Sequence, residues 1–241
     1  WSYKATWQLN SGVDADSIPD ADDNVMIKSN HDVTVNVNAA CSSLTISDGG
    51  TVWVDASIMI ASGKTLTVNG TLTWGAEGGP YPGRVTMLDG GTMVLKGGVV
   101  TTTGTRLVAG TGTVVMNGTS SQTLSFPTTL FGVPVDNSFY NLTINNASGV
   151  TFLSNQTVKG TLTLSEGNIV MGSNTLIIWP GGNVSRTSGY IVGNLQKNVA
   201  TGTPSLTFEI GDASNYTPID VSFASVTTGG NLIASTTPGD H

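Results

Sequence analysis

The chain has 241 residues, of which 38% are apolar and only 10% are charged, and its formal net charge at pH 7 is −7. Nine Lys and Arg residues are scattered singly, which argues against a nucleic acid as partner. The single cysteine, Cys41, gives no disulfide framework, and no run of ~18 consecutive apolar residues indicates a membrane span. Abundant Val, Ile and Thr predict a folded β protein rather than a disordered chain.

The first 32 residues differ from the rest, because Trp1, Tyr3 and Trp7 precede a run of aspartates that is broken by Pro19. A coil of stacked strands has an open first turn, whose edge must be covered to prevent end-to-end association. Aromatic side chains that plug the open core, followed by a charged turn, meet this need. The sequence therefore predicts an N-terminal cap over residues 1–32.

From Val33 onward, short stretches of alternating residues recur between Gly, Asn, Ser and Asp, which is typical of β-strands. These stretches include VTVNV (33–37), SLTI (43–46), TVWV (51–54), SIMI (57–60), TLTV (65–68) and TLTW (71–74). The connections are too short for crossover helices. The pairs Asn69-Gly70 and Asn117-Gly118 fit tight hairpin turns, so an antiparallel arrangement stays open.

Recurrence in register favours parallel stacking. NGTLTW (69–74) and KGTLTL (159–164) repeat one pattern, with Leu72, Leu162 and Leu164 expected inside. Turns of ~20–24 residues would place like residues above one another, as in a parallel β-helix. The sequence therefore predicts an all-β protein with a right-handed parallel β-helix, or solenoid, over residues 33–203. Four asparagines recur near the expected turns and could form ladders there: Asn146, Asn155, Asn174 and Asn183.

Two stretches interrupt this pattern. WGAEGGPYPGR (74–84) is a long loop, and FPTTLFGVPVDNSF (126–139), with its two prolines, predicts a detour or a seam between two blocks of the coil. After residue 203 the strands lengthen and a polar loop separates them. Residues 204–241 therefore predict a partial C-terminal β domain, the start of an antiparallel β-sandwich.

A family resemblance covers nearly the whole chain. Residues 6–74, from TWQLNSGVDADSIPDADDNVMI to GKTLTVNGTLTW, resemble the rungs that open many giant secreted and cell-surface proteins of the Bacteroidetes. Residues 138–178 are similar to repeated internal blocks of those proteins, and YIVGNLQKNV with LTFEIGDASNYTPIDVSF resembles the segment that follows. The resemblance implies export, by the type IX secretion route, and an adhesin-like or surface-coat role. It implies no catalytic residues.

The acidic run is the candidate metal site. Calcium takes six to eight oxygen ligands, and several carboxylates occur close together: Asp14, Asp16, Asp20, Asp22 and Asp23. The spacing of an EF-hand is absent, since Ile18 and Pro19 stand at two of its essential positions. The alternative is a solvated capping turn in which aspartate side chains close Asx-turns.

The loop 74–84 is the candidate carbohydrate site. Trp74 and Tyr81 flank Glu77 there, and sugars stack on exposed aromatic rings. The loop also stands on a rigid scaffold, where functional residues concentrate. The alternative is that Trp74 ends its strand inward and Tyr81 packs the loop against the coil.

Enzymatic chemistry finds little support in the sequence. A polysaccharide lyase is the main enzymatic alternative, by analogy of fold, and it would need cationic groups beside a uronate. Arg84 and Arg106 are separated by about one turn of the coil, so they could lie one above the other on one face. Cys41 is expected to be a buried apolar residue. No catalytic residue and no cofactor other than calcium is predicted.

These observations together favour a non-enzymatic extracellular scaffold at the cell surface. It would be structural and adhesive, and it would self-associate into filaments or a coat, or bind neighbouring surface proteins. The alternative is a glycan-binding or lyase-like β-helix module. Neither nucleic acid binding nor membrane insertion is predicted.

Overall fold

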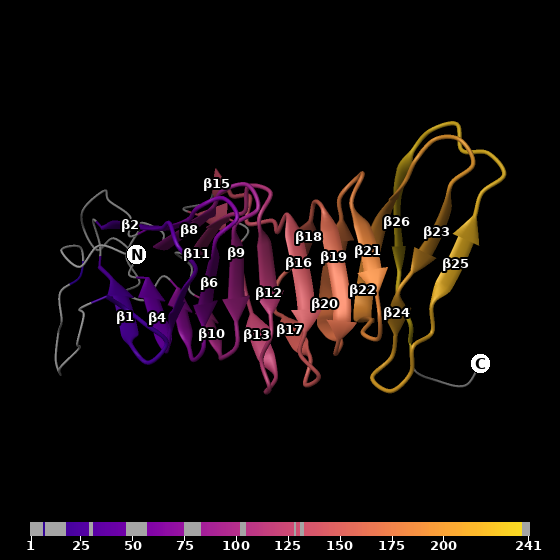
Figure 1. Cartoon of the computed structure of the whole chain (residues 1–241). Coiled ribbons are helices and arrows are strands. Elements are labelled where there is room, and N and C mark those ends of the chain that lie inside the picture. Colours follow the sequence, from indigo (N-terminus) through magenta and orange to yellow (C-terminus); the bar gives the residue numbers. More distant parts are fainter. Residues whose placement is uncertain are drawn as a thin grey trace.

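The protein is built from strands that lie side by side along one long axis (Figure 1). This computed structural model describes residue 7 and residues 18–28, 31–46, 57–74, 83–101, 105–127, 129–130 and 133–237. The described residues form strands, turns and bends and contain no helix. The predicted all-β class is therefore confirmed.

From β1 to β12 each strand pairs with the strand three places later, one turn along the coil, and this repetition produces three parallel sheets, the third of which continues beyond β12. The first sheet contains β1 (Asn24–Ile27), β4 (Ser43–Ile46), β7 (Leu72–Trp74) and β10 (Val99–Thr101). The second contains β2 (Asp32–Val35), β5 (Ser57–Ile60), β8 (Gly83–Met87) and β11 (Thr105–Val108). The third contains β3 (Ala39–Cys41), β6 (Thr65–Val68), β9 (Thr92–Leu95), β12 (Thr113–Met116), β16 (Asn141–Asn145), β19 (Thr161–Glu166) and β21 (Asn183–Arg186).

This topology decides between parallel stacking and hairpins. Asn69-Gly70 lies between β6 and β7, and these strands belong to different sheets. The two Asn-Gly pairs therefore turn corners of a coil, because Asn117-Gly118 likewise leaves the third sheet for another. The arrangement is β-helix-like, as the in-register repetition indicated.

The length of a turn varies more than the sequence indicated. Thr65 pairs with Thr92, Thr92 with Thr113, and Leu142 with Leu162, so these turns take 27, 21 and 20 residues. The first of them contains the loop 74–84, which adds residues without changing the register of the third sheet. An insertion between strands is tolerated because the paired strands, not the connections, set the stacking.

The fourth sheet begins close to the predicted seam. It contains β13 (Gln122–Leu124), β17 (Val150–Phe152), β18 (Gln156–Val158), β20 (Ile169–Ile178), β22 (Ile191–Val199), β24 (Ile210–Gly211) and β26 (Gly230–Ala234). β20 pairs with both β17 and β18, so one long strand covers two faces of the coil. Between β13 and β17 in the chain, β14 (Thr129–Leu130) and β15 (Val133–Pro134) form a short antiparallel pair, while the third sheet passes without a break from β12 to β16.

The side chain of Asn137 continues the second sheet beyond β11. Its Oδ1 accepts a hydrogen bond from the backbone N–H of Leu107 at 2.8 Å, and its Nδ2 donates to the carbonyl of Thr105 at 3.3 Å. The same Nδ2 donates to the carbonyl of Pro127 at 2.8 Å. Asn137 is 7% exposed, so these bonds satisfy buried backbone groups that no strand pairs.

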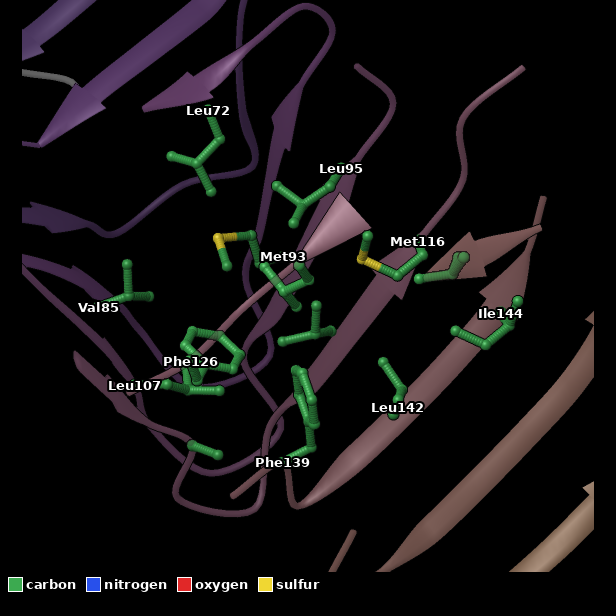
Figure 2. Packing of buried hydrophobic residues seen from close by; sticks show 14 of the residues in the cluster. Leu72, Val85, Met93, Leu95, Leu107, Met116, Phe126, Phe139, Leu142 and Ile144 are labelled. Carbon is green, nitrogen blue, oxygen red and sulfur yellow. The ribbon is translucent and has the colours of Figure 1, made fainter. Parts of the chain in front are cut away.

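The core consists of ladders of aliphatic side chains that run through successive turns. On the third sheet Leu66, Met93, Val114, Leu142 and Leu162 follow one another in register, and all are buried. Figure 2 shows Met93 and Leu142 pointing into the same interior. The predicted inward positions at Leu72, Leu162 and Leu164 are confirmed, since each is 0% exposed.

Four aromatic rings join the two halves of the core. Trp74 contacts Phe126 edge-on with 5.3 Å between ring centroids, Phe126 contacts Phe139 at 5.5 Å, and Phe139 contacts Phe152 at 6.0 Å. Edge-to-face pairs of this kind contribute beyond the area they bury. Phe126 and Phe139 lie close together in Figure 2. The core therefore continues across the seam through a chain of ring contacts.

Asparagines at the turns link neighbouring turns of the coil. Asn155 accepts from the backbone N–H of Thr175 at 2.8 Å, and Asn183 accepts from the hydroxyl of Thr161 at 2.8 Å. Asn146 donates to the side chain of Gln122 at 2.9 Å. Asn174 bonds the carbonyl of Phe152, at 3.5 Å. The four predicted ladder positions thus contact the adjacent turn, although their partners there are residues other than asparagine.

Pairing becomes antiparallel near the C-terminal end. β23 (Ser205–Phe208) pairs with β25 (Ile219–Ser222), and β26 pairs with β22. Arg186 ends an inner ladder, where its guanidinium carbon lies 3.6 Å from the ring centroid of Tyr216. Phe208 and Ile210 are buried against the coil. β24 still pairs in parallel with β22, so both directions of pairing occur after residue 203, and a separate β domain over residues 204–241 stays a prediction.

The segment predicted to form an N-terminal cap, residues 1–32, lies mostly outside the described residues. Trp7 and Ile18 are partly buried and pack against the core. Trp1 and Tyr3 lie outside the described residues.

Two glycines with positive φ provide a test of how closely the turns stack. Gly167 has φ +80° and a Cβ there would overlap the carbonyl oxygen of Asn146 in the turn below, whereas Gly172 has φ +56° and open space around it. We expect Gly172→Ala to lower the free energy of unfolding by ~1 kcal/mol and Gly167→Ala by ~2–4 kcal/mol. Chemical denaturation of the two variants measures the difference, and equal losses would contradict the close approach.

Candidate functional site

The outward face of the second sheet carries a polar column that crosses four strands. Asp32 pairs with Ser57, Ser57 with Arg84, and Arg84 with Arg106. The Ser57 hydroxyl donates to the Asp32 carboxylate. The predicted stacking of Arg84 over Arg106 is therefore confirmed, and it follows from the 22-residue turn between β8 and β11.

The two arginines have no acidic partner among the described residues. The ion pairs there are Lys159–Asp136 and Lys197–Glu209. The Nε atoms of Arg84 and Arg106 are buried and make no hydrogen bond. Like charges directly opposite each other on adjacent strands are destabilising, and a buried donor without a partner adds to that cost. The pair of arginines therefore does not stabilise the fold.

A hollow of ≈ 280 Å³ adjoins Arg106. Its polar lining comes from Arg106, Asp136, Ser138, Tyr140 and Lys159. Lys159 donates a hydrogen bond to Asp136. Burial raises the pKa of the Asp136 carboxyl, but hydrogen bonds from Lys159 and Ser138 outweigh it and hold that pKa below its usual value. The hollow thus contains an ionised carboxylate that is already neutralised by its own lysine.

An exposed tryptophan lies beyond Lys159. Trp179 is 52% exposed, and its backbone N–H donates to the carbonyl of Val158 at 2.9 Å, which places it one strand further along the coil. The Lys159 Nζ lies 6.0 Å from the centroid of the Trp179 ring. Cations and an aromatic face therefore share one side of the coil.

The predicted carbohydrate site at 74–84 needs a correction at Trp74. Its side chain is 1% exposed, and its indole N–H donates to the carbonyl of Gly83 at 2.7 Å. The ring belongs to the core and offers no face to a sugar. Glu77 and Tyr81 lie outside the described residues, so their part in a sugar site stays a prediction.

The acidic run forms a turn where the structure describes it. The backbone N–H of Asp20 donates to Asp23 Oδ2 and that of Asp22 to Asp20 Oδ1, both at 2.9 Å. The bond from Asp22 to Asp20 is an Asx-turn, as the capping alternative requires. No cluster of three His, Cys, Asp or Glu side chains that could hold a metal occurs within the described ranges. Asp14 and Asp16 lie outside them, so calcium binding by the full run stays a prediction.

Cys41 is buried, as predicted, and it serves the core rather than chemistry. Burial, with a smaller effect from the charge of Asp23, raises the pKa of its thiol to about 12. Since only the thiolate reacts, we expect Ellman's reagent at pH 8 to modify the folded protein ~1,000-fold more slowly than a free thiol. Protein unfolded in guanidinium should titrate one thiol per chain. Rapid modification of the folded protein would contradict the burial.

Sequence reasoning missed Asn137, the Lys159–Asp136 pair and Trp179. The partners of Asn137 and Asp136 are set by the seam, where no repeat length relates one strand to the next, whereas Trp179 follows Lys159 by one 20-residue turn. Of these residues, only Trp179 could have been recognised in the sequence as an aromatic residue at a turn, because it follows the apolar strand end LII and precedes Pro180 and Gly181.

No helix in the described part of the chain is long and apolar enough to cross a membrane.

Neither the curated proteins nor the solved structures include a match to the chain. The G8 domain family matches residues 6–127, slightly more than half of the chain. The match ends just after β13, so it includes Arg84, Arg106 and the side of the hollow formed by residues 106–110, but not Asp136, Ser138, Tyr140 and Lys159 on its other side. The chain therefore belongs to the G8 domain family.

Proposed function

We propose that this protein is a non-enzymatic structural and adhesive scaffold of the cell exterior. The observation that carries the proposal is the third sheet, in which seven parallel strands continue in register above one uninterrupted core. At ~4.8 Å per strand, the distance from β3 to β21 is ~30 Å. A continuous core of this length makes a stiff spacer without any disulfide.

The finer architecture belongs to the same proposal. We take the coil to be right-handed, because connections between parallel strands of one sheet almost always have that hand. Residues 1–32 would form the N-terminal cap, and residues 204–241 would begin an antiparallel β-sandwich. Export to the cell surface, by type IX secretion, is what the resemblance to Bacteroidetes surface proteins implies.

Self-association is the assembly that the edges of the sheets favour. β21 ends the third sheet and pairs on one side only, with β19, among the described strands. An exposed strand edge offers unpaired N–H and C=O groups to another chain. Ser185, at the centre of β21, is exposed. A neighbouring copy could therefore extend the sheet.

Electron microscopy and sedimentation of the purified protein at rising concentration test this function. We expect filaments or sheets of wild type and fewer of Ser185→Lys, because a charge at an edge blocks pairing. Thr143→Lys, on the same face but inside the sheet, is the control. Monomers at every concentration, or loss of assembly in both variants alike, would count against the scaffold.

Glycan binding is the second candidate function. The observation that favours it is the pair of guanidinium groups of Arg84 and Arg106, which have no acidic partner among the described residues. A glycan-cleaving activity would in addition release products from uronate polymers, and chromatography of such a digest would detect them.

A further inference from the structure

We propose that Arg84 and Arg106 form a binding site for an oxyanion group of an acidic polysaccharide, and that the polymer continues over the hollow to Trp179. The proposal takes up the second candidate function and names its ligand class and residues. It does not depend on whether the protein assembles.

The first argument is electrostatic. The chain carries net charge −7 and only nine basic residues, yet three of them, Arg84, Arg106 and Lys159, lie on this side of the coil. Two adjacent guanidinium groups repel each other, and nothing described in the protein offsets the repulsion of Arg84 and Arg106. An external anion would offset it, and guanidinium groups bind carboxylate and sulfate through paired hydrogen bonds.

The second argument concerns the unpaired donors. The Nε atoms of Arg84 and Arg106 are shielded from water and bond no described group. Buried donors are almost always satisfied. Adjacent strands are ~4.8 Å apart, so a single oxyanion lying between the two side chains can accept hydrogen bonds from the outer nitrogens of both guanidinium groups, and its charge offsets the cost of the two shielded Nε donors. Asp32 is two strands away from Arg84 in the same column and is bonded to Ser57.

The third argument indicates a polymer rather than a free ion. Beyond Arg106 the surface is hollowed and lined by Tyr140, Ser138 and Lys159, and Trp179 is an exposed residue. From β8 the path crosses β11, Asn137, β18 and the end of β20, which is four strand spacings or ~20 Å. A single small anion would leave most of this length empty, whereas an extended sugar chain can stack on the tryptophan and pair with the arginines.

The test is a binding titration with polygalacturonate, dextran sulfate and neutral dextran. Calorimetry measures the binding at low and at moderate salt. We expect binding of polygalacturonate, dextran sulfate or both, weaker binding at higher salt, and none of neutral dextran. Binding of polygalacturonate alone assigns a carboxylate ligand, and binding of dextran sulfate alone assigns a sulfate. Failure of both acidic polymers to bind, or equal binding of neutral dextran, overturns the proposal.

The variants locate the site. Arg84→Gln with Arg106→Gln should weaken binding at least about tenfold, since hydrogen bonds to charged groups are the strong ones. Lys96→Gln removes one positive charge from an exposed residue after β9 and should change affinity less than about twofold. Trp179→Ala should weaken binding severalfold. Equal losses in Lys96→Gln and in the arginine variant would show non-specific attraction and sink the site.

Arg106→Lys covers the case in which the double variant does not fold. It keeps the charge but loses the planar fork, so we expect weaker binding at an unchanged melting temperature. Unchanged affinity in Arg106→Lys would overturn paired recognition by the two guanidinium groups. Assembly in the microscope is a separate readout, so a failure of glycan binding leaves the scaffold proposal to its own test.

Discussion

Replacing Phe139 by alanine is expected to lower the free energy of unfolding by ~3–5 kcal/mol. Phe139 is 0% exposed and lies between the rings of Phe126 and Phe152, at the point where the two halves of the core meet. The truncation removes both edge-to-face contacts and leaves a cavity that rigid strands on every side cannot fill. Chemical denaturation monitored by circular dichroism measures the loss.

Leu153→Ala is the matched control for this experiment. Leu153 directly follows Phe152 but is 61% exposed, so its truncation should change stability by less than ~0.5 kcal/mol. If Phe139→Ala costs no more than Leu153→Ala, the seam is not packed as described. A second transition in the unfolding curve of Phe139→Ala would instead show that the aromatic rings couple two blocks that can unfold separately.

A second large effect is expected at Lys197. Its Nζ donates to Glu209 Oε2 at 2.7 Å and to the carbonyl of Thr207 at 2.5 Å, and both charged side chains are 11% exposed. Lys197→Met leaves the Glu209 carboxylate buried without a cation. We expect a loss of ~3–5 kcal/mol at pH 7, because an uncompensated buried charge is strongly destabilising.

A double-mutant cycle separates the value of the pair from the penalty of breaking it. Lys197→Met combined with Glu209→Leu replaces two charges by apolar groups, and it should recover most of the stability that either single change removes. Denaturation midpoints of the four proteins provide the measurement. Strictly additive losses would contradict the direct pairing of Lys197 with Glu209 between β22 and the residue after β23.

Much of this architecture could be predicted from the sequence, because in a parallel coil a separation along the chain becomes a neighbour in space. Arg84 and Arg106 differ by 22 residues and lie in adjacent strands. The inward positions Leu162 and Leu164 follow from strand periodicity. The same periodicity could have predicted that Trp74 is buried, because a residue two positions after the buried Leu72 faces the same side of the strand.

Other features could not be predicted, since they depend on tertiary contacts that no local pattern encodes. Asn137 acts as a substitute for a backbone peptide beside β11, and its partners Leu107 and Thr105 are thirty or more residues away. The hollow forms only because the stretch before β16 is laid against the end of β11. Because the turns differ in length, no fixed repeat length predicts such contacts.

The direction of the hydrogen bonds between turns determines how the molecule responds to an applied force. Strands such as β6, β9 and β12 follow one another along the long axis, so the bonds that join them are aligned with that axis. Tension between the two ends loads these layers in series, and the weakest layer yields first while the others hold. A transverse force likewise passes through every layer in turn, so the layer with the weakest pairing sets the strength of the whole molecule.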